Sequence, residues 1–177
     1  MRFLIALLFC AICTTPALAQ NAGPDHAATG FYKHYLQLKP RGIPDAATRK
    51  QFDRLLTPSL VDQLKQAERA EVAHRKATQN LEPPLFEGDL FSSLYEGATA
   101  YSIGACTIEG RRAYCDIDLT FMAEAGAQPT TWTDKLVLLK RIGGWRVDDI
   151  GFGGAWDFAQ HGSLRASLRD IIRYAGE

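Results

Sequence analysis

The chain has 177 residues, of which 46% are hydrophobic, and its 20 basic residues balance 20 acidic ones to give a net charge of zero. This length fits one domain that buries a single core of ordinary size. Because a neutral chain has no overall positive field, the composition argues against a nucleic-acid partner, or an anionic membrane, bound mainly through charge.

Residues 1–19 have the pattern of a secretory signal peptide. Arg2 supplies a positive charge, and residues 3–13 form an apolar run shorter than the ~18 residues that a membrane-spanning helix needs. Ala17 and Ala19 are small residues at the two positions that a signal peptidase reads. We therefore predict cleavage after Ala19, export to the periplasm and, since no later apolar run is long enough, no transmembrane segment in the mature chain.

The mature chain is predicted to begin with a flexible polar leader over residues 20–30, followed by a single domain over residues 31–177. Phe31, Tyr35 and Leu38 stand at positions i, i+4 and i+7, so they form one apolar stripe. This spacing predicts the first helix of the domain.

Two further helices are expected before the middle of the chain. Asp45 is a suitable N-cap for one of them, and Thr57 followed by Pro58 has the residue types found at the start of the other. The apolar residues of this third helix fall on one side and charged residues largely on the opposite side, so one face is expected to pack. The apolar side holds Leu60, Val61, Leu64, Ala67 and Val72.

After residue 84 the pattern changes to strands separated by turn residues. Two hairpins are expected, one around the loop 109–112 and one around Gly143 and Gly144. The strand segments that they join are 101–107, 113–122, 132–141 and 145–152.

The four cysteines divide into two pairs. Cys10 and Cys13 lie in the signal peptide, and neither follows the small residue that attachment of a lipid requires. Cys106 and Cys115 remain in an oxidising compartment, where a pair is expected to form a disulfide. With a loop at 109–112 the two lie opposite each other on neighbouring strands, which is the geometry that a cross-strand disulfide needs.

Ser163 is a suitable N-cap for a terminal helix with an apolar face. The elements together predict an α+β fold in which N-terminal helices pack on a curved antiparallel sheet and a C-terminal helix follows. A sheet that curves around a helix makes a cone, and such a cone often holds a pocket. The apolar face of the terminal helix consists of Leu164, Leu168, Ile171 and Ile172.

Two blocks of the sequence stand out: residues 87–97, with the sequence EGDLFSSLYEG, and residues 144–150, with the sequence GWRVDDI. Together they resemble an uncharacterised family of small exported bacterial proteins. The resemblance implies the cone-shaped nuclear-transport-factor-2-like fold and an exported protein. It implies no chemistry, because the family has no established catalytic residues, and the wider fold includes isomerases, dehydratases and pure binding proteins.

Asp149 is the candidate catalytic base. Alternation along a strand puts it on the face of Trp145 and Val147, where a carboxylate among apolar groups would have a raised pKa. Tyr35 is the candidate for a hydroxyl that polarises a substrate. The alternative is structural: one of Asp148 and Asp149 is solvated, and the other accepts hydrogen bonds from Arg146 or from a helix N-terminus.

Other sites receive less support. Glu87, Asp89 and Glu96 form an acidic group without the alternation of a calcium loop, and Asp89 is expected to cap a short helical turn. The histidines lack the spacing of zinc ligands, so we expect no metal site. The chain contains no phosphate-binding loop and no dinucleotide-binding fingerprint, so we expect no cofactor.

Aromatic residues are the strongest indication of binding, because an apolar ring with a polar atom suits a ligand pocket or a partner surface. We expect a non-catalytic periplasmic binding protein for an envelope partner or a small apolar ligand. The alternatives are an isomerase-like enzyme and an immunity or inhibitor protein that uses the acidic loop 87–96, and a homodimer is left open. The candidate binding residues are Tyr32, Tyr35, Tyr95, Tyr101, Trp145 and Trp156.

Overall fold

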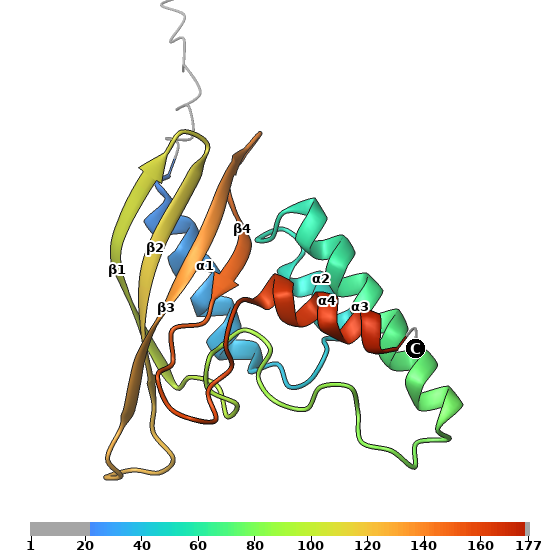
Figure 1. Cartoon of the computed structure of the whole chain (residues 1–177). Helices are drawn as coiled ribbons and strands as arrows, with labels where there is room; N and C mark the ends of the chain where they lie inside the picture. Colours follow the sequence, from blue (N-terminus) through green and yellow to red (C-terminus); the bar gives the residue numbers. More distant parts are fainter. Residues whose placement is uncertain (1–21, 176–177) are drawn as a thin grey trace, which may run out of the picture.

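The computed structural model of the chain describes residues 22–175 (Figure 1). The predicted signal peptide and its cleavage point lie outside the described residues. Within residues 22–175, the helices are too short or too polar to cross a membrane.

The described residues form the α+β fold that the sequence predicts, with four helices and one antiparallel sheet of four strands. The strands follow one another as a meander, so each pairs with its neighbour in the chain. In chain order the elements are α1 (Pro24–Leu38), α2 (Ala46–Phe52), α3 (Pro58–Ala77), β1 (Ala100–Glu109), β2 (Arg112–Phe121), β3 (Thr130–Arg141), β4 (Gly144–Gly151) and α4 (Leu164–Tyr174).

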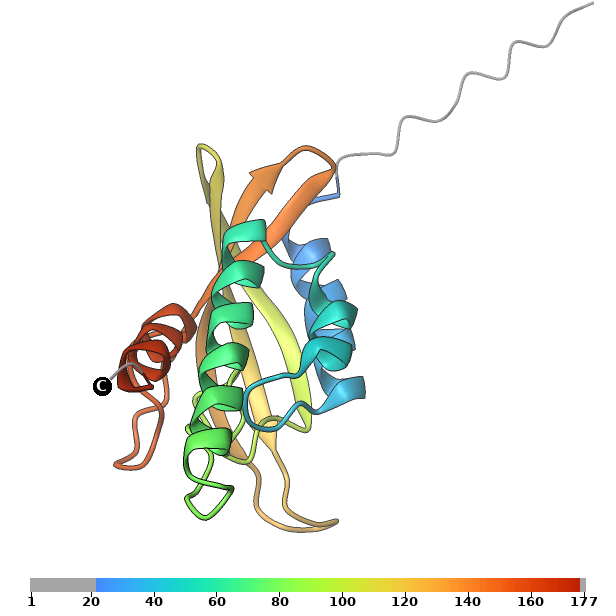
Figure 2. The ribbon, with the colours of Figure 1, turned by 90° about the vertical axis from the view of Figure 1, so that its right-hand side faces the viewer.

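The helices lie around the curved sheet in a cone-like arrangement. Helix α1 crosses one face, which we call the inner face, while α3 runs beside the β4 edge and α4 packs against α3 and β4 (Figures 1 and 2). The segment just before α3 closes the β4 edge, because Thr57 and Leu55 exchange backbone hydrogen bonds with Val147. The backbone of the β4 edge is therefore paired at Val147, which makes association through this edge less favourable.

Three of the helices begin at the residues that the sequence predicts. Asp45 accepts a hydrogen bond from the Thr48 amide, and Thr57 caps α3 with Pro58 at its first position. Ser163 caps α4 in the same way. Each cap satisfies an amide that a helix N-terminus leaves without a partner, which is why these short polar residues mark the boundaries.

The predicted flexible leader over residues 20–30 is wrong from residue 24 onward, because α1 begins at Pro24 and continues through residue 30. Proline suits the first position of a helix, and Asp25 in the first turn interacts favourably with the helix dipole. Ala28 is fully buried, so this turn packs against the core. The prediction for Val72 is also wrong: it is 61% exposed, because the C-terminal half of α3 extends beyond the sheet (Figure 1).

The inner face of the sheet and α1 enclose the core. Alternate residues of the strands point inward, among them Ile117, Leu136 and Leu138, and all three are fully buried. Aromatic rings of α1, α2 and the loop after residue 88 fill the space opposite them, with Phe31 in contact with both Phe52 and Phe91. The middle of the cone is therefore packed with side chains.

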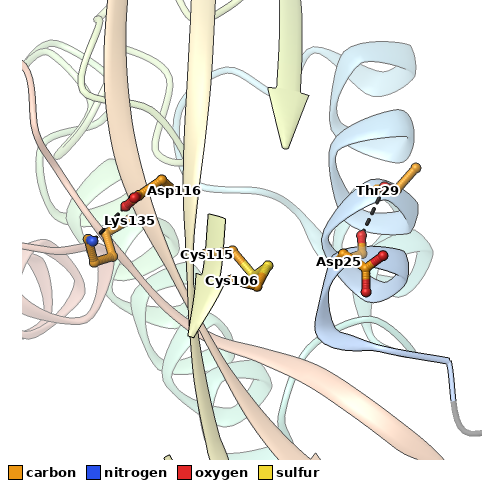
Figure 3. Close-up of a disulfide and its surroundings, with 6 residues drawn as sticks. All are labelled: Asp25, Thr29, Cys106, Cys115, Asp116 and Lys135. Atoms are coloured by element: carbon orange, nitrogen blue, oxygen red, sulfur yellow. Dashed lines mark hydrogen bonds and ion pairs between the residues drawn. A yellow bond between two sulfur atoms is a disulfide. The ribbon is translucent and has the colours of Figure 1, made fainter. Parts of the chain in front are cut away.

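The predicted disulfide is confirmed. Cys106 and Cys115 are opposite each other in the β1–β2 register, and their sulfur atoms are bonded. Figure 3 shows the bond on the side of the sheet that faces α1, whereas the ion pair of Asp116 with Lys135 lies on the opposite face. The disulfide fixes the pairing of the first hairpin.

Replacing both Cys106 and Cys115 by alanine is expected to lower the free energy of unfolding by about 2–3 kcal/mol. The bond closes a loop with a sequence separation of 9, and a loop of this size restricts the unfolded chain by about that amount in the chain-entropy model. Guanidinium unfolding of the oxidised protein and of the variant measures the difference. Reduction of the wild-type protein must give the same loss; a much smaller one would contradict the prediction.

Candidate functional site

Tyr35 and Asp89 form a buried pair at the centre of the molecule. The Tyr35 hydroxyl donates a hydrogen bond of 2.6 Å to Asp89 and accepts one of 2.8 Å from the Ala98 amide. Burial raises the pKa of Asp89 from 3.8 to about 6, although the hydrogen bonds from Tyr35 and the Phe91 amide oppose the shift. Burial and the adjacent Asp89 also raise the pKa of Tyr35. The pair is part of the core. One carboxylate oxygen of Asp89 accepts the Phe91 amide of the following turn at 2.8 Å, in keeping with the expected capping role, and the other binds Tyr35 of α1, which is 54 residues away in the sequence.

Asp134 is a second buried carboxylate, and the sequence analysis missed it. It lies on the inner face of β3 and is fully buried. It accepts hydrogen bonds from the Ser93 amide (3.0 Å), the Gly153 amide (3.0 Å) and the Trp132 indole (3.2 Å), and also from the Ser93 hydroxyl. One carboxylate thus holds two irregular segments of the chain against the sheet. Every oxygen is occupied, so this acid is suited to structure and not to catalysis.

Asp149 is not on the face that the sequence analysis predicts. A bulge shifts the pairing of β3 with β4, so that Leu138 is opposite Val147 but Val137 is opposite Asp149. The extra residue reverses the alternation and turns Asp149 to the outer face of the sheet. There its carboxylate accepts hydrogen bonds of 2.9 Å from the amides of Arg165 and Ile150. It acts as an additional cap of α4, as in the structural alternative, and does not meet Tyr35.

Asp148, the bulged residue, binds the side chain of Arg165. The two form an ion pair of 2.7 Å, and Thr57 donates to the same carboxylate oxygen at 2.6 Å. Arg165 also donates to Gln63 and Ser59 of α3. These contacts attach α4 to α3 and β4, and they use the polar groups that a catalytic site in this region would need.

The six candidate aromatic residues do not form one pocket. Tyr32 and Tyr35 are buried in the core, and Tyr101 is half-buried with its hydroxyl on the backbone of α1. Tyr95 is 43% exposed, and the guanidinium of Arg41 lies over its ring.

The two tryptophans of the set have different surroundings. Trp156 is half-buried, and its ring contacts that of Trp132 edge to face. Trp145 is almost fully buried, yet it lines a cavity. Of the six, Trp145 therefore has the surroundings of a ligand-binding residue.

The cavity beside Trp145 is the candidate functional site. It measures about 410 Å³ and lies where the first turns of α1 approach the β3–β4 hairpin. Its wall consists largely of small residues, so that backbone and the indole ring face the space. These wall residues are Gly23, Ala27, Gly30, Gly143, Gly144 and Trp145.

Charged and ionisable groups lie in the wall of this cavity or next to its tryptophan. The ammonium group of Lys140 lies 5.2 Å from the centre of the Trp145 ring. His26 and Arg146 also line the cavity, and Arg146 donates a hydrogen bond to the Trp145 carbonyl. An apolar wall with a few polar groups at the edge is typical of small-molecule sites.

Gly30 is part of the wall of this cavity. It lies within α1, where glycine is less favourable than alanine by about 0.5–1 kcal/mol. A Cβ atom at Gly30 would meet nothing within 4 Å. Sequence reasoning missed the site, because residues 20–30 were assigned to a flexible leader, where a glycine gives no signal; only the helix that the structure shows there makes Gly30 unusual.

Neither a metal site nor a known relative adds evidence about the function of this cavity. Among residues 22–175, no three histidine, cysteine or acidic residues are grouped so that they would hold a metal ion. A scan against protein-family models gives no match, and a search of curated proteins finds no significant match. The functional argument therefore rests on the geometry of the molecule.

Proposed function

We propose that the protein is an exported, non-catalytic binding protein that holds a small, largely apolar molecule in the cavity beside Trp145. Export is supported by the disulfide between Cys106 and Cys115, which is stable in oxidising compartments. The pattern of residues 1–19 supports it as well. The resemblance to small exported bacterial proteins agrees with this proposal.

The size and lining of the cavity support a small molecule as the ligand. A volume of about 410 Å³ is within the usual range of ligand pockets, about 300–1,000 Å³. The indole of Trp145 offers a flat apolar surface, and the glycines allow a ligand to approach the backbone closely.

A non-catalytic role is supported by the hydrogen bonds that the candidate acids already accept within the fold. Asp89, Asp134 and Asp149 each accept hydrogen bonds from groups of the fold. None of the three lines the cavity beside Trp145. Asp149 could act as a base inside the cone only if β4 had no bulge. Asp89, the middle acid of the loop 87–96, is buried, so it is not exposed to a partner as the inhibitor hypothesis requires.

Gly30 carries the proposal and supplies its test. Gly30→Leu is expected to fill the cavity and abolish ligand binding, while the better helix propensity of leucine raises the free energy of unfolding by about 0.5–1 kcal/mol. The measurement is native mass spectrometry of the mature protein purified gently from the periplasm. The wild-type protein should carry an added mass of the order of a few hundred daltons, a drug-sized ligand, and Gly30→Leu should not.

Gly30→Ala is the matched control, because one methyl group leaves most of the cavity open. It should keep the added mass and gain similar stability. An added mass that persists in Gly30→Leu would place the ligand elsewhere, and a wild-type protein without added mass would speak against a small-molecule ligand.

A further inference from the structure

A second cavity of about 410 Å³ lies at the same end of the sheet, beside the start of α3. Three arginines from two hairpins line it. Arg111 comes from the β1–β2 turn, and Arg141 and Arg146 come from the hairpin of β3 and β4. Residues far apart in the sequence thus bring three positive charges to one hollow of the surface.

In the part of the chain that the structure describes, these arginines are not paired with a carboxylate: Arg111, Arg141 and Arg146 take part in none of its ion pairs. Asp53 is the one acid among the residues that line this cavity, and its carboxylate forms an ion pair of 3.4 Å with the guanidinium of Arg49. Three like charges around one cavity repel each other unless an anion is present, so the arrangement favours the binding of an anion.

Two of the guanidinium groups are already held in place. Arg111 donates a hydrogen bond of 3.1 Å to the Lys140 carbonyl, and Arg146 donates one of 3.1 Å to the Trp145 carbonyl. Each guanidinium has five N–H donors, so most donors remain available. A group that is held before binding loses less entropy when the anion arrives.

The number of arginines indicates the class of anion. A carboxylate is saturated by one bidentate arginine, whereas a phosphate group has three or more acceptor oxygens and up to two negative charges. Three guanidinium groups that reach the cavity from different positions can each donate hydrogen bonds to oxygens of one phosphate group. Leu56, Pro58 and the wholly exposed Ile142 line the same cavity and offer apolar contact to the group that carries the phosphate.

We infer that the cavity of Arg111, Arg141 and Arg146 is an anion-binding site for a phosphate group that is joined to a larger, partly apolar molecule. This inference goes beyond the ligand site at Trp145 and does not depend on it. The two cavities share the side chain of Arg146 but no other lining residue.

The test uses inorganic phosphate as the probe. Calorimetric titration is carried out at constant ionic strength, with chloride as the balancing anion. The double variant Arg111→Gln/Arg141→Gln is expected to bind phosphate about 100-fold more weakly than the wild-type protein, about tenfold for each arginine, because each removes charge-assisted hydrogen bonds. Both side chains are exposed, so the variant should fold, and circular dichroism checks this.

Arg112→Gln is the matched control. Arg112 is the next residue after Arg111 and is equally exposed, but it does not line the cavity. It should change phosphate affinity by less than about twofold, the size of a screened surface charge effect. If Arg112→Gln and the double variant lose the same phosphate affinity, the effect comes from general surface charge, and the inference is overturned. Phosphate affinity that survives in the double variant would do the same.

Vesicle sedimentation distinguishes the two sources of such a phosphate group. Binding to phosphatidylglycerol vesicles but not to phosphatidylcholine vesicles, with loss in the double variant, would identify a lipid headgroup. Binding of inorganic phosphate without binding to either vesicle would identify a soluble phosphorylated molecule. Absence of both interactions would overturn the inference.

Discussion

Asp134→Ala is expected to lower the free energy of unfolding by about 3–5 kcal/mol. The variant leaves the amides of Ser93 and Gly153 and the indole of Trp132 without their acceptor. Each unsatisfied buried donor costs about 1–3 kcal/mol, and the methyl group also leaves a cavity. Denaturant unfolding measures the change.

Asp116→Ala is the control for Asp134→Ala. Asp116 lies on the neighbouring strand β2, and its carboxylate forms an exposed ion pair with Lys135 on the outer face (Figure 3). Such pairs contribute about 0–1 kcal/mol. Similar losses in the two variants would mean that the hydrogen bonds of Asp134 add nothing special to the fold.

The stability of the protein should contain a component that decreases by about 3 kcal/mol in total as the pH rises from well below 4 to well above 6, with about 2 kcal/mol of this loss between pH 4 and pH 6. The pKa of Asp89 is 3.8 in the unfolded chain and about 6 in the folded protein, because burial disfavours the charged form. Between these values the folded state binds more protons than the unfolded state, so rising pH favours unfolding. Two pKa units correspond to about 3 kcal/mol.

Asp89→Asn isolates this component, since asparagine has nearly the same shape and does not titrate. The difference in unfolding free energy between the wild-type protein and Asp89→Asn, measured from about pH 4 to pH 7, removes the contribution of the other acids. This difference should move in favour of the variant as the pH rises. A difference that is constant over this range would show that Asp89 has an ordinary pKa in the folded protein.

The parts of the fold that depend on neighbouring residues were predictable. A cap such as Asp45 or Ser163 acts within one helical turn, so the local sequence contains all the information. The register of Cys106 with Cys115 follows from a short loop in the same way.

The candidate site was not predictable by these means. Asp149 changes face because of a bulge that exists only when β4 pairs with β3, and alternation within one strand cannot reveal it. The hydrogen bond between Tyr35 and Asp89 joins residues that are 54 positions apart in the sequence, so no local pattern predicts it. The cavity beside Trp145 arises where α1 meets a hairpin more than 100 residues later, so no local pattern of the sequence indicates it.

The position of Asp134 has a consequence for the order in which the chain folds. Its partners Ser93 and Gly153 lie 41 and 19 residues away, in segments without regular structure of their own. These segments gain their hydrogen bonds only after β3 is in place, so closing them is a late, long-range step of the kind that slows folding. A chain that stops before β3 would hold residues 89–98 only through the contacts of Tyr35 with Asp89 and Ala98, without the hydrogen bonds from Asp134. The irregular segments are therefore expected to complete their order after the sheet has formed.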